Sequence, residues 1–62
     1  MALSAPERLR KWRGEKPLRE AAEDLGIDFS ALNRFERGER TPTGWVAAKI
    51  EEVTKIPVAL WF

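Results

Sequence analysis

The chain has 62 residues, 44% of them hydrophobic and 34% charged, and a net charge of +1 at pH 7, which is normal for one small folded domain and excludes a disordered chain. It contains no Cys and no His, which removes disulfides and the usual zinc ligands, so we expect no metal and no cofactor. The longest apolar run, 56–62, is far shorter than the ~20 residues of a membrane span, and no apolar leader opens the chain, so we expect a single cytoplasmic domain over residues 1–62.

The first predicted helix begins at a capping box. Ser4 and Glu7 have the spacing at which each side chain satisfies a free backbone amide of the other residue. The helix is expected to continue to about Arg13. Gly14 then breaks it, and Pro17 suits the first turn of the next helix.

Two helices separated by a short turn are predicted within residues 17–38. Apolar residues recur at helical spacing twice, first over 18–25 and then over 31–35. Between them, Gly26 can end a helix in the left-handed conformation, and the Asp28 side chain can cap the free amides of the next one. Helices joined by so short a turn cross at a steep angle, so this segment is predicted to be a helix-turn-helix unit.

A fourth helix is expected after Thr43, and Pro57 can open a short last helix that runs through Phe62. The inner face of the fourth helix is predicted to hold four residues at helical spacing: Trp45, Val46, Ile50 and Val53. The predicted fold is therefore all-α, a compact bundle of about five short helices that contains a helix-turn-helix.

Three segments resemble the phage-repressor (Cro/cI-type) helix-turn-helix family: the AAEDLGI sequence of 21–27, the run 30–38 and Pro42. The resemblance covers about residues 9–61. It implies a lambda-repressor-like DNA-binding domain, encoded by a bacterium or a phage, that acts as a transcription regulator of the repressor type. The implied partner is double-stranded DNA with a palindromic operator, which a homodimer would bind.

The third predicted helix, 28–37, is the candidate recognition helix. Five residues at spacing i, i+1, i+4, i+5 and i+8 share its outer face: Phe29, Ser30, Asn33, Arg34 and Arg37. None of them is acidic. Arg34 matches the paired acceptors of guanine, although a solvated arginine is the alternative, and the resemblance favours base readout. The residues predicted to read bases are Phe29, Ser30, Asn33 and Arg34.

The other members of this face carry their own alternatives. Phe29 cannot form hydrogen bonds, so it would contact thymine methyl groups or else pack against the neighbouring helix. Ser30 either contacts a base, the slightly favoured alternative, or is a passive residue of the first turn. Asn33 either pairs with adenine or faces solvent.

Phosphate contacts are predicted at both ends of the unit. The start of the second helix, at Leu18 and Arg19, offers free amides and the positive end of a helix dipole. The side chain of Leu18 cannot form a hydrogen bond to a phosphate. The resemblance implies a glutamine at this position, whose side chain would contact the DNA backbone. Arg37 and Arg40 follow the recognition helix and are expected to contact phosphates, with a solvated turn as the alternative.

The resemblance also implies a structural ion pair between Arg13 and Glu36, with Arg10 as the alternative partner. Four residues, three in the apolar tail and one near the start of the fourth helix, could either join the core or form a homodimer contact: Leu60, Trp61, Phe62 and Trp45. The core role is slightly favoured, because so small a domain needs the buried surface, whereas the two-fold symmetry of operators would require the dimer contact.

Three other hypotheses compete with DNA binding. A protein-interaction module of the same fold, such as an antitoxin-like subunit, is favoured by the low net charge and by Leu18. An engineered scaffold without a natural operator is compatible with every motif. An enzyme is the least favoured, because the sequence has no His, Cys or Tyr and shows no acid pair with a pocket.

Overall fold

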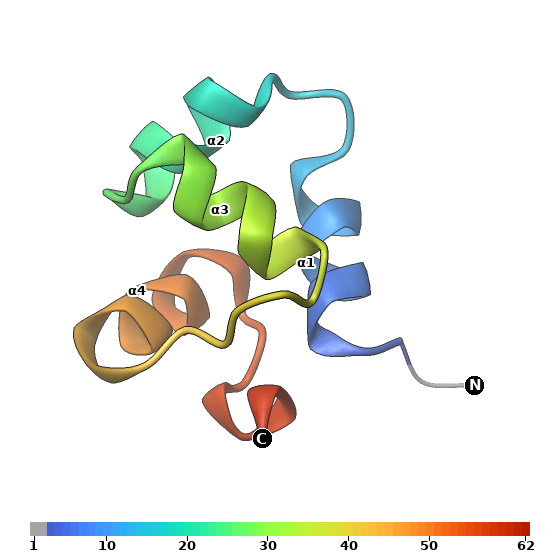
Figure 1. Ribbon diagram of the computed structural model, residues 1–62, viewed down its shortest axis with the longest axis vertical. Coiled ribbons are helices and arrows are strands. Elements are labelled where there is room, and N and C mark those ends of the chain that lie inside the picture. The colour runs from blue at the N-terminus through green and yellow to red at the C-terminus, as the bar shows by residue number, and fades with distance from the viewer. Residues whose placement is uncertain (1–2) are drawn as a thin grey trace.

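The computed structural model describes residues 3–62, which form four α-helices and a short 3-10 helix (Figure 1). In chain order the elements are α1 (Ala5–Arg13), α2 (Leu18–Leu25), α3 (Phe29–Glu36), α4 (Gly44–Thr54) and η1 (Val58–Trp61). No strand occurs in this part of the chain, and the predicted all-α class is confirmed. None of the helices described is long and apolar enough to cross a membrane.

The predicted capping box is present at the start of α1. The Ser4 hydroxyl accepts a hydrogen bond from the Glu7 amide at 3.4 Å, and the Glu7 carboxylate accepts one from the Ser4 amide at 3.1 Å. These two bonds satisfy backbone groups that the first turn of a helix leaves unpaired. The hydrogen bond from the Ser4 side chain lowers the pKa of the Glu7 carboxyl below its ordinary 4.5.

The lowered pKa of Glu7 gives the first testable expectation. Because the folded state holds this carboxyl ionised, its contribution to stability is present above about pH 4.5 and is lost as the pH falls through the lowered folded pKa. Ser4→Ala removes the main cause, so an NMR titration should find the pKa of Glu7 moved back toward 4.5. An unchanged Glu7 pKa in Ser4→Ala would show that the capping box does not set it.

The turn between α2 and α3 is built as predicted at Gly26 and differs at Asp28. Gly26 has φ 68° in the left-handed region, and the Ile27 amide donates to the Ala22 carbonyl at 3.0 Å, closing the end of α2. Asp28 is the N-cap residue of α3, but its side chain accepts no backbone hydrogen bond there. Its carboxylate accepts a bond from the Ser30 hydroxyl instead.

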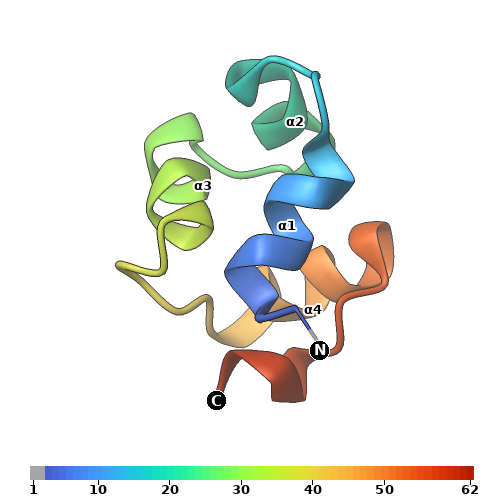
Figure 2. The ribbon, with the colours of Figure 1, turned by 90° about the vertical axis from the view of Figure 1, so that its right-hand side faces the viewer.

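The core lies where α3 packs against α1 and α2, with α4 beneath them (Figures 1 and 2). Each α-helix contributes to it, and the fully buried large side chains are Leu9, Leu25, Leu32, Ile50 and Pro42. This buried layer holds α2 and α3 in place, because both helices are too short to be stable in isolation.

The predicted inner face of α4 is correct except at Trp45. Val46 and Val53 pack against the core and Ile50 is fully buried, but Trp45 is 66% exposed. Ala47 is the second buried residue of this helix. Trp45 precedes Val46 by one residue, about 100° around the helix, so it lies outside the stripe that faces the core.

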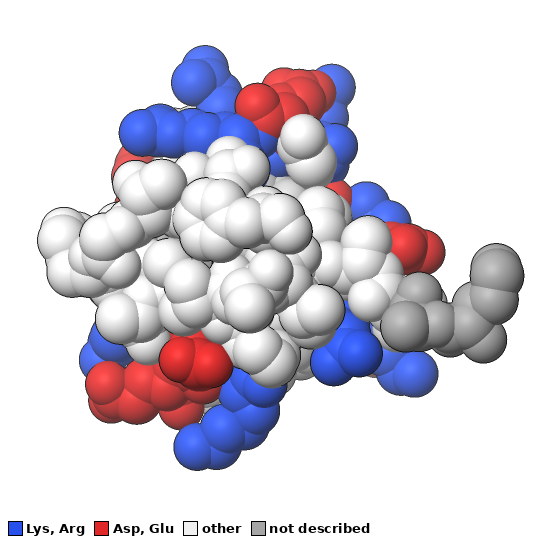
Figure 3. Space-filling model, turned by 90° about the horizontal axis from the view of Figure 1, so that it is seen from below, with Lys and Arg blue, Asp and Glu red and all other residues white. Residues whose placement is uncertain are grey.

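The chain end divides between core and surface. Trp61 is partly buried, and its ring lies 6.2 Å from that of Phe35, centroid to centroid. Leu60 and Phe62 are exposed, Phe62 at 79%. Figure 3 shows the side of the molecule that carries η1 as a broad uncharged surface with charged residues at its margin. The predicted short last helix is present as the 3-10 helix η1, with Pro57 as its N-cap.

Candidate nucleic-acid interface

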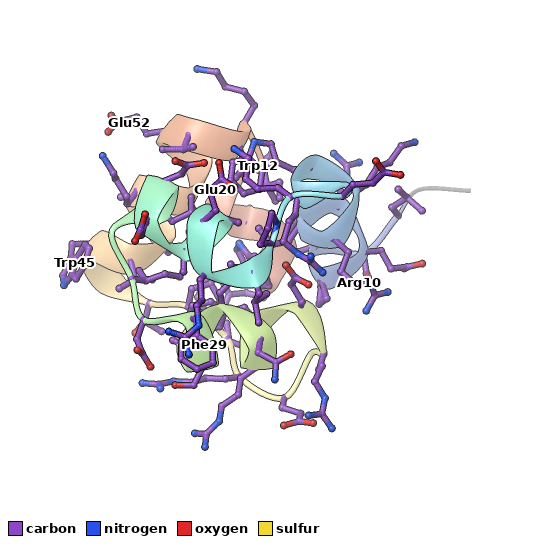
Figure 4. The ribbon with its side chains drawn as sticks, turned by 90° about the horizontal axis from the view of Figure 1, so that it is seen from above. Arg10, Trp12, Glu20, Phe29, Trp45 and Glu52 are labelled. Carbon is purple, nitrogen blue, oxygen red and sulfur yellow. The ribbon has the colours of Figure 1, made fainter. Side chains whose placement is uncertain are left out.

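One side of α3 faces solvent, along the edge of the molecule seen in Figure 4. Leu32 and Phe35 turn inward and are buried. Four of the five residues predicted to share the outer face are exposed, namely Phe29, Ser30, Arg34 and Arg37, while Asn33 is half-buried. The helical spacing in the sequence therefore predicted this face, apart from the partial burial of Asn33.

Arg34 is the cation on this face that no carboxylate neutralises. It lies in the last turn of α3, it is exposed, and it forms no ion pair with any of residues 3–62. Its guanidinium therefore keeps its donors available for a ligand in front of α3.

The outer face itself holds no acidic residue, as predicted, but carboxylates of flanking residues contact it at both ends of α3. At the start, the Asp28 carboxylate accepts a hydrogen bond from the Ser30 hydroxyl, so the only donor of the Ser30 side chain is already engaged. At the end, Arg37 forms an exposed ion pair with Glu39 at 2.9 Å. Both carboxylates belong to residues that flank α3, so the helical spacing of α3 could not predict these two contacts.

Phe29 and Arg19 form a contact that the sequence reasoning missed. The guanidinium carbon of Arg19 lies 4.6 Å from the centroid of the Phe29 ring, within the range of a cation–π interaction. Figure 4 shows Phe29 between α2 and the outer edge of α3. The two residues are ten positions apart on different helices, so no local pattern in the sequence could have found the pair.

The start of α2 presents its backbone and the Arg19 side chain rather than the side chain of Leu18. Leu18 is half-buried and packs against the core. The first amides of α2 follow Pro17, which caps the helix without a side-chain hydrogen bond. On the far side of α3, Arg40 is exposed and forms no ion pair within the described residues.

Two arginines of α1 fix the end of α3. Arg13 donates from Nε and Nη2 to the two carboxylate oxygens of Glu36 at 2.7 and 2.9 Å, and Arg10 donates to the Glu36 carbonyl at 2.7 Å. Glu36 is 3% exposed, so this paired charge is inside the protein. The hydrogen bond to Glu36 raises the pKa of Arg13 further above its ordinary value. The arrangement ties α3 to α1 and orients its outer face.

The fold and this surface define a class: a small helical domain that exposes one face of the second helix of a helix-turn-helix to solvent. A family model described as Helix-turn-helix matches residues 7–61, and the chain belongs to this Cro/cI-type family. No curated protein and no solved structure gives a significant match. The family is one of DNA-binding regulators rather than enzymes, so the function is DNA binding of the transcription-regulator type.

Proposed function

We propose that the protein is a transcription regulator of the repressor type that binds a specific double-stranded DNA sequence, with α3 in the major groove and two copies on a palindromic operator. The observation that carries this proposal is Arg34, exposed and without an ion pair on the outer side of α3. A major groove admits one helix, and an arginine in that position can donate to O6 and N7 of one guanine.

The neighbouring residues extend the proposed readout toward the start of α3. Ser30 retains acceptor capacity because its proton is directed to Asp28. Asn33 is half-buried, so only part of its side chain is available to a base. Phe29 offers an apolar contact in the first turn.

Phosphate contacts would orient α3 on the duplex. We assign them to the free backbone amides at Leu18 and Arg19, to the Arg19 side chain and to Arg40. Arg37 joins them only if it exchanges Glu39 for a phosphate. Because this last contact replaces an existing ion pair, it should contribute less to affinity than Arg40 does.

A second copy of the chain is the proposed occupant of the uncharged surface in Figure 3. Three exposed apolar side chains on α4 and at η1 support this: Trp45, Leu60 and Phe62. In a two-fold dimer each copy presents the same patch to the other, and an uncharged patch meets no repulsion from itself. Trp61 is assigned to the core rather than to this contact, because it packs on Phe35.

Trp45→Glu is expected to weaken association of the two copies without unfolding either, because the side chain is already 66% exposed. Sedimentation of the complex with an operator duplex should show one bound chain where the unaltered protein gives two. Trp45→Phe is the matched control, since it keeps an apolar ring and should retain the dimer. Equal stoichiometry for both variants would exclude Trp45 from the contact.

Placement of α3 in the major groove can be tested on a duplex selected from a randomised pool. Methylation of guanine N7, which lies in the major groove, should block binding at one guanine of each half-site, whereas methylation of adenine N3 in the minor groove should not. Interference from the minor groove alone would contradict the proposal. A failure to select any duplex would instead favour a protein partner for this surface.

A further inference from the structure

Phe29 is the apolar residue on the proposed reading surface of α3. It is 40% exposed even though the Arg19 guanidinium lies over its ring. Arg19 forms no ion pair within the described part of the chain. Its guanidinium therefore interacts with the Phe29 ring instead of with a carboxylate. The stack connects α2 to the first turn of α3 and fixes the ring there while leaving part of it open to a ligand (Figure 4).

The chemistry of a phenyl ring restricts what it can read. Base edges in the major groove present hydrogen-bond donors, acceptors and one apolar group, the C5 methyl of thymine. A ring without donors or acceptors can discriminate only through that methyl group. 5-Methylcytosine carries the same group at the same carbon, so an apolar contact of this kind accepts both methylated pyrimidines and disfavours uracil and unmodified cytosine.

A small open cavity lies beside the stack of Arg19 on Phe29. Its volume is about 170 Å³, below the range of about 300–1,000 Å³ that is usual for small-molecule sites. Ala22 and Ile27 join Phe29 as its apolar lining, and its charged lining is Arg19, Glu23 and Asp28. The apolar part of this lining offers a surface that a neutral methyl group can contact.

We infer that Phe29 reads the C5 methyl group of one pyrimidine in each half-site, and that Arg19 is a positioning residue that holds the ring for this contact. The inference rests on the proposed function, because it requires α3 in the major groove. It adds that binding responds to DNA methylation: a cytosine at this position is accepted when its C5 carbon is methylated.

The experiment uses a duplex selected by the full chain from a randomised pool. Each thymine of one half-site is replaced by uracil in turn, which removes only the methyl group, and affinity is measured by fluorescence anisotropy. At one position the loss should be about fourfold, the value for one buried carbon group. At that position a duplex with 5-methylcytosine should also bind about fourfold more tightly than one with cytosine.

Protein variants then test whether the dependence of affinity on the methyl group comes from the stack of Arg19 on Phe29. We call two quantities the methyl ratios: the affinity for thymine divided by that for uracil, and the affinity for 5-methylcytosine divided by that for cytosine, at the sensitive position. Phe29→Ala should bring both methyl ratios to about one. Arg19→Lys keeps the charge but stacks less well, so it should lower the ratios while the salt dependence of binding stays unchanged. Arg40→Lys is the matched control, an arginine with no stacked ring, and should leave the ratios intact.

The outcomes separate this inference from the proposed function. If no thymine is sensitive to loss of its methyl group while Arg34→Ala still relaxes the sequence preference, Phe29 does not read a methyl group and the DNA-binding assignment stands. If the pool yields no specific duplex, both are overturned. Because the methyl ratios of the unaltered protein decide the first point, the result holds even if Phe29→Ala does not fold.

Discussion

Glu36→Ala is expected to cost about 3 kcal/mol of unfolding free energy, the low end of the range for breaking a buried ion pair. Glu36 is 3% exposed and accepts two hydrogen bonds from Arg13, whose side chain stays 25% exposed. Removing the carboxylate leaves the Arg13 guanidinium without its partner, although solvent can reach part of it. A protein of this size has a total stability of only about 3–9 kcal/mol, so the loss is a large share of the whole.

Urea unfolding followed by circular dichroism measures this loss, with Glu39→Ala as the matched control. Glu39 also pairs with an arginine, Arg37, but at an exposed position, and such pairs contribute about 0–1 kcal/mol. Glu36→Gln should fall between the two, because the amide keeps an acceptor for Arg13. Equal stability of the Glu36→Ala and Glu39→Ala variants would contradict the structural role of the buried pair.

Arg34→Ala is expected to weaken binding to the selected duplex by about 5- to 150-fold, the value of one bidentate contact to guanine. The fold should not change, because Arg34 is exposed and holds no other residue in place. The preference should relax at one base pair of each half-site and stay sharp at the others. Competition binding against duplexes altered at single positions measures both effects.

Arg40→Ala provides the contrast for Arg34→Ala. Arg40 is assigned to a phosphate, so its loss should weaken binding to all sequences alike and reduce the salt slope by about 1. If Arg34→Ala behaves in the same way as Arg40→Ala, then Arg34 contacts the DNA backbone and does not read a base.

The helices were predictable from the sequence because their signals are local. Ser4 and Glu7 marked the start of α1, and Gly26 marked the end of α2, where only a residue that tolerates positive φ fits without strain. Trp45 was placed wrongly, because helical spacing fixes a stripe but not its edges. The short last helix after Pro57 was predicted as well, although the sequence alone does not distinguish an α-helical turn from a 3-10 helix there.

The sequence predicted which residues share the outer face of α3, but it did not predict the contacts that their side chains form. Spacing placed Phe29 and Arg34 on one side of α3, where the structure also has them. The stack of Arg19 on Phe29 depends on how α2 crosses α3, which no spacing encodes. The hydrogen bond from Ser30 to Asp28 depends on the orientation of the Asp28 carboxylate. This carboxylate can accept either from the backbone amides at the start of α3 or from the Ser30 hydroxyl, and the sequence does not decide between them.

The central claim, that α3 reads a DNA sequence while the flanking arginines and amides hold phosphates, is tested most directly by selection from a randomised duplex pool at two salt concentrations. The account predicts enrichment of one palindromic site, with affinity that falls steeply as salt rises. Salt-sensitive binding without enrichment, or no binding even at low salt, would contradict it.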